Sequence, residues 1–478
     1  LPALTTRWNE AWKFPTSDAR FAVRDKPADP AGMNTCAACH ARRATLSETR
    51  QPGAPLADSH RLALLTAPNY HADGQQREEV YVWASFLQSK MYQNGVTCMD
   101  CHEPHALKLR AEGNALCTRC HNAAAFDAPK HHRHLAGGKG AQCVNCHMPT
   151  QNYMVIHARQ DHSLRVPRPD LSQSLGSPNA CTQCHTERKP AWAASAMDKW
   201  YGKAWRERPH YGTTLQAGET RGVHALPGLL ELAANPATPA IVRATAATLA
   251  QPHVSPATLP ATLALLQDSD PSVRIAALGM LASLDAPTRL RAAVPLLGDP
   301  SRIVRMQAAR TLAPLADDAF EPAALDAFRN AAAEYVAAER FNADRPEHRT
   351  NLGGFLAERG ETVAAEGEYR AALALDPRFV PAWANLADLR RLQGREAEVE
   401  AAGEHPQSDR TGEKPEHPDP TPSSTRRSGR PGDSRDPRPK VGSRVAPRND
   451  DPPRCVAKPR WPHCSGAQTR LAQPRSPE

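Results

Sequence analysis

The chain has 478 residues, of which 5% are aromatic, 45 are proline and 12 are cysteine, and its formal net charge is +8. A chain of this length has room for about two to four domains, but so few aromatic residues do not favour one large close-packed globule. No apolar run approaches the ~18 residues that a membrane-spanning helix needs. Because no charged and then apolar leader precedes the folded part, we expect that a signal peptide has been removed or that the amino end is truncated.

Residues 1–205 show little helical periodicity. One amphipathic helix is predicted over residues 78–93, where Asn94-Gly95 ends it, and a second over residues 191–205. The rest is predicted to form turns and loops, which is too little regular structure to build a core from side chains alone. An interior filled by a cofactor would explain this deficit.

Five copies of a Cys-x-x-Cys-His motif lie in this region. Two residues between the cysteines allow both sulfurs to reach the two vinyl groups on one edge of a porphyrin, and the histidine that follows then lies beneath the iron as its proximal ligand. The pattern therefore predicts five covalently bound c-type haems. The cysteines are Cys36 and Cys39, Cys98 and Cys101, Cys117 and Cys120, Cys143 and Cys146, and Cys181 and Cys184, and the histidines are His40, His102, His121, His147 and His185.

Zinc ribbons, thiol-disulfide enzymes and structural disulfides also use paired cysteines, but none of them requires a histidine after the second cysteine. Histidine makes up 20 of the 478 residues, so its presence after all five pairs by chance has a probability of about 10⁻⁷. Five haems would also add about ten propionate carboxylates, which brings the holoprotein close to neutrality. The positive net charge is therefore no sign of nucleic-acid binding.

The spacing of the motifs constrains their arrangement. The first cysteines of successive motifs are separated by 62, 19, 26 and 38 residues. About thirty residues per haem is too little to give each haem its own globular pocket. The porphyrins are therefore expected to pack against one another, close enough for electrons to hop between them, and the long first gap predicts that the first haem is partly detached.

The region also contains eight histidines outside the motifs, which exceeds the five distal positions by three. This number is expected if most or all of the haems have two histidine ligands, which leaves the iron without an open site. His105 is the best single candidate, because it lies too close to the second motif to serve its own haem and is expected to serve a neighbour. For Met148 and Met154, ordinary packing is favoured over ligation. The eight histidines are His60, His71, His105, His131, His132, His134, His157 and His162.

Residues 222–320 are rich in Ala, Leu and Val and carry a repeat. A Val-Arg pair recurs at intervals of 31 residues, starting at Val242, Val273 and Val304. A fixed period of this size predicts a helical solenoid, similar to HEAT repeats although short for that class. An irregular helical bundle is the alternative.

Residues 321–400 carry a second period of 34 residues, in which Glu334-Tyr335 recurs as Glu368-Tyr369. This resembles the tetratricopeptide repeat, whose helical hairpins must stack to bury their apolar faces. Such a region is expected to dock proteins or peptides, and a spacer that supports the haem region is the alternative. We expect residues 222–400 and residues 1–205 to have separate hydrophobic cores.

The repeat stops abruptly after residue 400. Fifteen of the 45 prolines fall in residues 401–478, among many Arg, Ser, Asp and Gly residues. This composition cannot bury enough apolar surface to fold. A disordered tail and an out-of-frame translation are both consistent with it, and the second is favoured because the repeat ends in mid-unit.

Segments such as 81–92, 101–105 and 165–170 resemble the tetratricopeptide-containing multihaem cytochromes c. These are relatives of the tetrahaem cytochrome that serves hydroxylamine oxidoreductase and, more distantly, of the multihaem nitrite reductases. The resemblance covers residues 30–400 and implies a periplasmic or otherwise exported protein. It also favours, as distal ligands, His71, His105, His132, His134 and His162.

The predicted fold is therefore mainly α: a loop-rich multihaem domain over 1–205, HEAT-like repeats over 222–320, tetratricopeptide repeats over 321–400 and a tail over 401–478. The favoured function is electron transfer between redox partner proteins that dock on the repeats. A reductase of small nitrogen or sulfur oxyanions is the alternative. It would need one open haem, with Tyr153, His157 and Arg159 as candidate acid, base and anion-binding groups, although a solvated loop is the favoured interpretation of these three. A regulatory scaffold is a third possibility, for which five haems are excessive.

Overall fold

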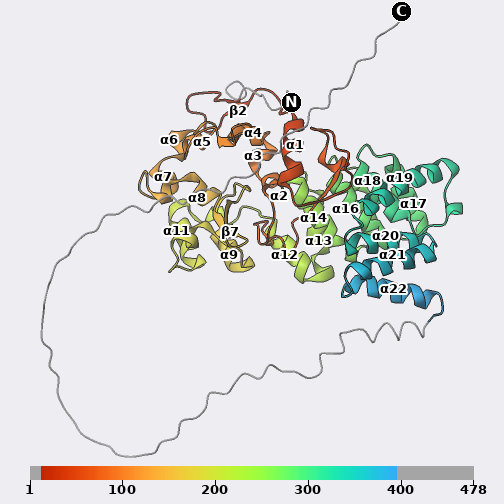
Figure 1. Ribbon diagram of the computed structural model, residues 1–478. Helices are drawn as coiled ribbons and strands as arrows, with labels where there is room; N and C mark the ends of the chain where they lie inside the picture. The colour runs from red at the N-terminus through yellow and green to blue at the C-terminus, as the bar shows by residue number, and fades with distance from the viewer. Residues whose placement is uncertain (1–11, 396–478) are drawn as a thin grey trace, which may run out of the picture. The chain divides into compact units, whose positions relative to one another are not determined.

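The computed structural model describes residues 12–395, and the predicted tail over 401–478 lies outside this part. The described chain is mainly helical, which confirms the predicted fold class (Figure 1). No helix within it is both long and apolar enough to cross a membrane. Its strands form two-stranded antiparallel sheets. The strand pairs are β1 (Trp12–Lys13) with β2 (Val23–Arg24), β3 (Arg43–Thr45) with β4 (His60–Leu62), β5 (His102–Glu103) with β6 (Lys108–Leu109), and β7 (Thr150–Tyr153) with β8 (His157–Gln160).

The amino-terminal part is built from short helices joined by loops, as the weak periodicity predicts. Few of these helices exceed two turns, so they bury little apolar surface of their own. They are α1 (Pro30–His40), α2 (Val82–Leu87), α3 (Lys90–Gln93), α4 (Cys98–Cys101), α5 (Ala115–Thr118), α6 (Ala123–Phe126), α7 (Pro129–His132), α8 (Cys143–His147), α9 (Pro169–Leu175), α10 (Ala180–Cys184) and α11 (Pro190–Tyr201).

The helix predicted over residues 78–93 is divided into α2 and α3. The first of them ends at Leu87, and Ser89 caps the second, because its side chain accepts a hydrogen bond from the backbone N–H of Tyr92. Gly95, with a φ of +80°, follows α3 as predicted. The helix predicted over 191–205 also ends early, since Gly202 has a φ of +72° and a 3₁₀ turn follows it.

The 31-residue period forms a stack of helical pairs. Val242, Val273 and Val304 are fully buried at equivalent places in α14, α16 and α18. The arginine after each valine reaches a carboxylate in the following unit: Arg243 pairs with Asp268, Arg274 with Asp299 at 2.8 Å and Arg305 with Glu334 at 2.6 Å. The Val-Arg pair is therefore the contact that joins one unit to the next. The helices of this part are α12 (Gly212–Thr220), α13 (Leu226–Ala234), α14 (Ala240–Ala250), α15 (Leu259–Leu265), α16 (Pro271–Met280), α17 (Ala286–Ala293) and α18 (Arg302–Leu312).

The 34-residue period forms two helical hairpins. Its tyrosines, Tyr335 and Tyr369, are buried at equivalent positions of the first helix of each hairpin. The ring of Tyr369 lies against Gly353, where a Cβ atom would come within 2.6 Å of the ring. A glycine is therefore needed for this close packing. The four helices are α19 (Pro322–Phe341), α20 (Pro346–Glu358), α21 (Thr362–Leu375) and α22 (Val380–Leu392).

The apolar core of the repeats continues into the amino-terminal part. Leu65 and Val80, which are 2% and 0% exposed, belong to the same buried cluster as the helices of the 31-residue period. The backbone N–H of Leu65 also donates a hydrogen bond to Oγ1 of Thr245 at 3.2 Å. The expectation of separate cores is therefore wrong, because the chain between the first two motifs supplies side chains to the core of the repeats. The predicted domain boundaries stay predictions.

Candidate haem-binding site

Each Cys-x-x-Cys-His motif adopts a helical turn. The N–H of His121 donates to the carbonyl oxygen of Cys117 at 3.0 Å, and the N–H of His185 donates to that of Cys181 at 2.9 Å. In such a turn, residues three and four apart lie on one side of the helix. The two sulfurs and the imidazole of a motif are therefore presented toward the same side, as attachment to one porphyrin requires.

Buried polar contacts fix the second motif in place. Asp100, inside the motif, accepts hydrogen bonds from Nε1 of Trp12 and from the guanidinium of Arg24, both at 2.9 Å. It also accepts from the backbone and the hydroxyl of Thr97, which closes a capping box at the start of α4. The first strand pair is thereby tied to the helix that carries Cys98.

Thiols of successive motifs are neighbours. The thiols of Cys36 and Cys98 lie close enough for each to shift the pKa of the other, and so do those of Cys117 and Cys143. Two further pairs lie within electrostatic range; these are Cys101 with Cys120 and Cys146 with Cys184. The five motifs therefore follow one another in space in the order of the sequence. The first is not detached from the second, contrary to the expectation from the long gap.

Three motif histidines face a second histidine. The ring centroids of His102 and His162 are 6.4 Å apart. Those of His147 and His131, and those of His185 and His134, are each 6.2 Å apart. A metal–imidazole bond of about 2 Å plus about 1.1 Å from the nitrogen to the ring centre gives roughly 6.2 Å between two rings that share one metal ion. The residues present therefore fit a haem iron held between two imidazoles.

The outer nitrogens of these rings are held by backbone carbonyls. Nδ1 of His162 lies 2.9 Å from the oxygen of Gln160, Nδ1 of His147 lies 2.8 Å from that of Arg165, and Nδ1 of His134 lies 2.5 Å from that of His132. A carbonyl oxygen only accepts, so Nδ1 carries the proton and Nε2 is left as the metal-binding atom. Burial also lowers the pKa of His162, which favours the neutral form that binds metals.

Only some of the predicted distal ligands lie opposite a motif histidine in the structure. His134 and His162 each lie opposite a motif histidine. In the cluster at 131–134, the ring opposite the fourth motif is that of His131 and not that of His132. Within residues 12–395, the rings of His71 and His105 make no ring contact with a motif histidine, and His105 is exposed.

The signal that separates His131 from His132 is a helix end. Both residues lie in the last turn of α7, and Arg133 after them has a left-handed backbone with a φ of +60°. This reversal lets the N–H of His134 donate to Nδ1 of His132 at 3.2 Å, so His132 supports its neighbour. The sequence indicates that ligands lie among residues 131–134, but it does not indicate which of these rings faces a motif histidine.

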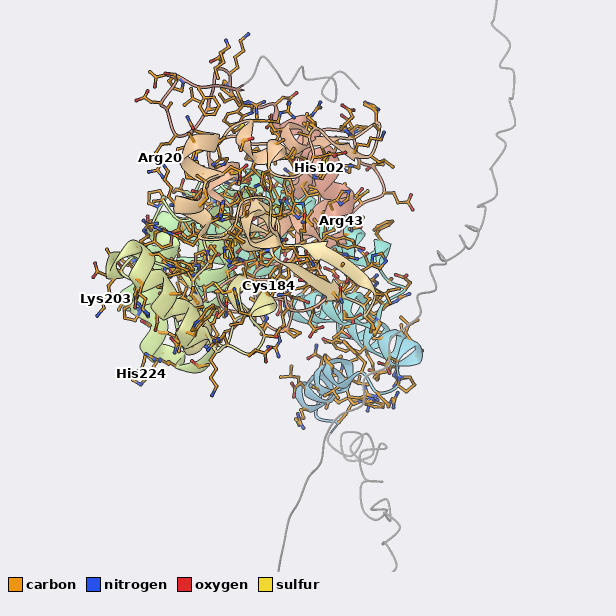
Figure 2. All side chains as sticks on the ribbon, turned by 90° about the vertical axis from the view of Figure 1, so that its left-hand side faces the viewer. Arg20, Arg43, His102, Cys184, Lys203 and His224 are labelled. Atoms are coloured by element: carbon orange, nitrogen blue, oxygen red, sulfur yellow. The ribbon has the colours of Figure 1, made fainter. Side chains whose placement is uncertain are left out.

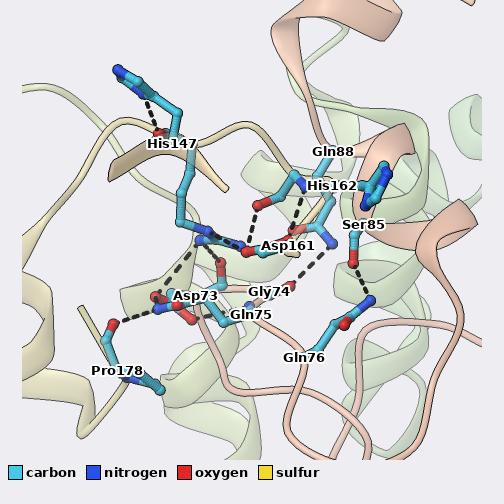
Figure 3. A network of polar contacts seen from close by, with 12 residues as sticks. Asp73, Gly74, Gln75, Gln76, Ser85, Gln88, His147, Asp161, His162 and Pro178 are labelled. Carbon is cyan, nitrogen blue, oxygen red and sulfur yellow. Dashed lines mark hydrogen bonds and ion pairs between the residues drawn. The ribbon is translucent and has the colours of Figure 1, made fainter. Parts of the chain in front are cut away.

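A buried polar network joins two of the histidine pairs (Figure 3). The carbonyl of Arg165 receives the hydrogen bond from His147, while its guanidinium bonds Asp161 at 2.9 Å and pairs with Asp73 at 3.8 Å. Burial lowers the pKa of Arg165, but the two carboxylates raise it by more, so the net shift is upward and the group stays charged. Because Asp161 directly precedes His162, the segment 160–165 positions both His162, opposite the second motif, and His147 of the fourth motif.

The alternatives to haem have no support in the described part of the chain. Between residues 12 and 395, no three His, Cys, Asp or Glu side chains are grouped to hold a metal ion. The ten motif cysteines are free thiols in the structure and form no disulfide.

The candidate reductase groups lie on the β7–β8 hairpin. Arg159 is paired with Glu79 and stacks over Tyr153 and Tyr81, while His157 is exposed. An arginine that already has a carboxylate partner is a poor binding group for an anionic substrate. This arrangement weighs against a reductase site at the hairpin.

Comparison with known protein families gives a match in the motif region and a match in the helical repeats. The family model of the doubled CXXCH motif matches residues 90–126, and the model of HEAT repeats matches residues 226–313 and 259–343. No curated protein and no solved structure matches the chain. The doubled motif is a signature of multihaem c-type cytochromes, points to covalent c-type haem and implies an exported protein. The HEAT match confirms the solenoid predicted from the 31-residue period.

Proposed function

We propose that the protein transfers electrons between redox partners through five covalently bound haems. The three histidine pairs, with rings 6.2–6.4 Å apart, carry this proposal. A haem with two histidine ligands exchanges one electron between ferric and ferrous iron and offers no open position to a substrate. The chain's task is then to hold the imidazoles in place and to set the distances between neighbouring sites.

The proposed axial pairs combine a motif histidine with a distal one. We assign His162 to the second motif, His131 to the fourth and His134 to the fifth, so His131 takes the place predicted for His132. For the first and third motifs, His71 and His105 stay predicted ligands.

The order of the thiols supports a linear route. Successive motifs adjoin one another, and Cys39 and Cys184, in the first and last motifs, are the exposed cysteines among the ten. Both ends of the series therefore reach the surface, while the middle is more enclosed. Electrons that enter at one end can then leave at the other.

The repeats are proposed to dock proteins, as helical solenoids do. We further propose that the 34-residue units over 321–400 are tetratricopeptide repeats and that the exported protein is periplasmic. The first proposal rests on the sequence resemblance together with the stacked hairpins α19 to α22, and the second rests on the sequence resemblance and the haem motif.

A second candidate function is the reduction of a small nitrogen or sulfur oxyanion. It is favoured by one observation: among residues 12–395, no histidine ring lies in contact with the rings of His40 or His121. A haem at one of these motifs would then have an open face unless His71 or His105 moves to it.

The test combines haem content with spin state. Mass spectrometry of the protein matured by a c-haem assembly system is expected to show five haem adducts, and the pyridine haemochrome is expected to have a c-type band. Electron paramagnetic resonance of the oxidised protein is expected to be wholly low-spin. Three or fewer adducts would refute the cofactor count. A high-spin haem that binds nitrite or hydroxylamine and turns it over would favour the reductase.

A further inference from the structure

One surface beside the fifth motif is both basic and aromatic. We call it the α11 face and define it by Arg133, Arg188, Lys189, Trp192, Lys199 and Lys203. Helix α11 buries Ala193, Ala194 and Met197 and turns Trp192 and Lys199 to the solvent. Figure 2 views the side of the molecule that carries Cys184 and shows Lys203 projecting from the ribbon.

This face adjoins the proposed fifth haem site. The ring of Trp192 lies 4.8 Å from the ring of His185, and the guanidinium of Arg188 lies 5.7 Å above Trp192. Both Cys184 and His185 are exposed. An electron that arrives at this last site is therefore within a few ångströms of the outer edge of the face.

The same face is fastened to the histidine cluster. Tyr201, at the end of α11, donates a hydrogen bond to the carbonyl oxygen of His131 at 2.5 Å, and Arg133 donates to that of Trp200 at 3.3 Å while stacking over Tyr201. The surface is thus continuous from α7, which carries His131, to α11. A molecule bound here would sit over the ends of two proposed histidine pairs.

The charge of the face is strongly one-sided. Residues 130–139 and 185–208 hold nine Lys and Arg but only three Asp and Glu. Of these three, Asp198 is bound by Arg206 at 2.8 Å. Lys189, Lys199 and Lys203 make no ion pair with a carboxylate of residues 12–395. Two haem propionates at the fifth motif would remove about two charges and leave the face positive.

We propose that the α11 face is the docking site of a redox partner that presents an acidic surface around its own redox centre. The proposal rests on the proposed electron-transfer function. It adds where one redox partner binds and that the binding surface of this partner is acidic. Unpaired lysines around an aromatic centre match the anatomy of an interface, with a polar rim and an aromatic anchor. Opposite charges also steer the encounter and can raise association rates by about 10- to 1000-fold. The solenoid is then free to bind a different protein.

The test uses fully reduced flavodoxin, a small acidic electron carrier, as the probe. One electron passes from the flavodoxin hydroquinone, which becomes the semiquinone, to a ferric haem of the full-length holoprotein, which becomes ferrous. Stopped-flow spectroscopy follows this step. The variant Lys189→Glu/Lys199→Glu/Lys203→Glu reverses the face. The matched control Lys26→Glu/Lys90→Glu/Arg340→Glu changes three exposed cations elsewhere by the same charge.

We expect the second-order rate constant at low salt to fall by about tenfold or more in the α11-face variant and by about twofold at most in the control. The difference should vanish near 0.5 M salt, where charges are screened beyond about 4 Å. Trp192→Ala should slow transfer within the complex without changing the salt dependence. Equal slowing of both triple variants, greater slowing of the control or no slowing would overturn the proposal.

A dithionite reduction separates this proposal from the proposed function. If dithionite reduces all haems of the two triple variants as in the native protein, a missing difference with flavodoxin counts against the docking face alone. If the native protein contains no reducible low-spin haem, the electron-transfer function itself fails.

Discussion

Replacing Leu65 with Ala should destabilise the haem-motif region and the repeats together. Leu65 lies between the first and second motifs but is 2% exposed within the core of the repeats. The change removes about three carbon atoms, worth roughly 2.4 kcal/mol of transfer free energy at about 0.8 kcal/mol each. A residual cavity brings the expected loss of unfolding free energy to about 3–4 kcal/mol.

The assay is guanidinium unfolding followed by two signals in the holoprotein. Absorbance of the Soret band reports loss of axial ligation, and circular dichroism at 222 nm reports the repeats. We expect one shared transition that moves to lower denaturant in both signals. The control Leu392→Ala, at a site that is 86% exposed, should cost less than about 0.5 kcal/mol. Two separate transitions, with only one shifted, would refute the continuous core.

Three further predictions address the site. Replacing His131 with Ala should create one high-spin ferric haem in the electron paramagnetic resonance spectrum, whereas His132→Ala should leave all haems low-spin. The reverse result would show that His132, as predicted from the sequence, is the ligand. Arg165→Met should cost about 3–5 kcal/mol of unfolding free energy, because it leaves two buried carboxylates without their cation, while Arg329→Met at an exposed pair should cost less than about 1 kcal/mol. Burial, with nearby arginines, lowers the pKa of His60 to about 4, so the unfolded state takes up a proton first as pH falls below its ordinary value. Between pH 7.5 and 5 this group should contribute a loss of about 2 kcal/mol of stability, so the loss measured in His60→Gln should be smaller than that of the native protein by about this amount.

The two repeat periods were predictable because each depends on local contacts that recur. The period of 31 is visible in the sequence because the arginine of each Val-Arg pair must meet a carboxylate of the next unit, as Arg274 meets Asp299. By contrast, the break between α2 and α3 depends on a single side chain. Ser89 fits a helical pattern by composition, but its hydroxyl caps the following turn instead.

The motif cysteines and histidines could be proposed as haem-binding residues for a different reason. Covalent attachment to one porphyrin fixes the spacing of the two cysteines and the histidine, so five consecutive positions are enough to recognise a motif. A distal ligand has no such constraint, since it reaches its partner through the fold. The ring of His131 is aimed by the end of α7 and by the left-handed Arg133, neither of which has a strong signal in a single sequence.

The long gap before the second motif shows how these two parts depend on each other. The first cysteines of the two motifs are 62 positions apart, which by itself does not fix where the first motif lies, yet the thiol of Cys36 lies close to that of Cys98. The intervening chain explains this, because Leu65 and Val80 are buried in the core of the repeats. The two ends of the gap are thereby brought together on one support. We infer that the solenoid, beyond its proposed docking role, also helps to set the distance between the first two proposed haem sites. A change at Leu65 should therefore slow electron transfer between these sites as well as lower stability.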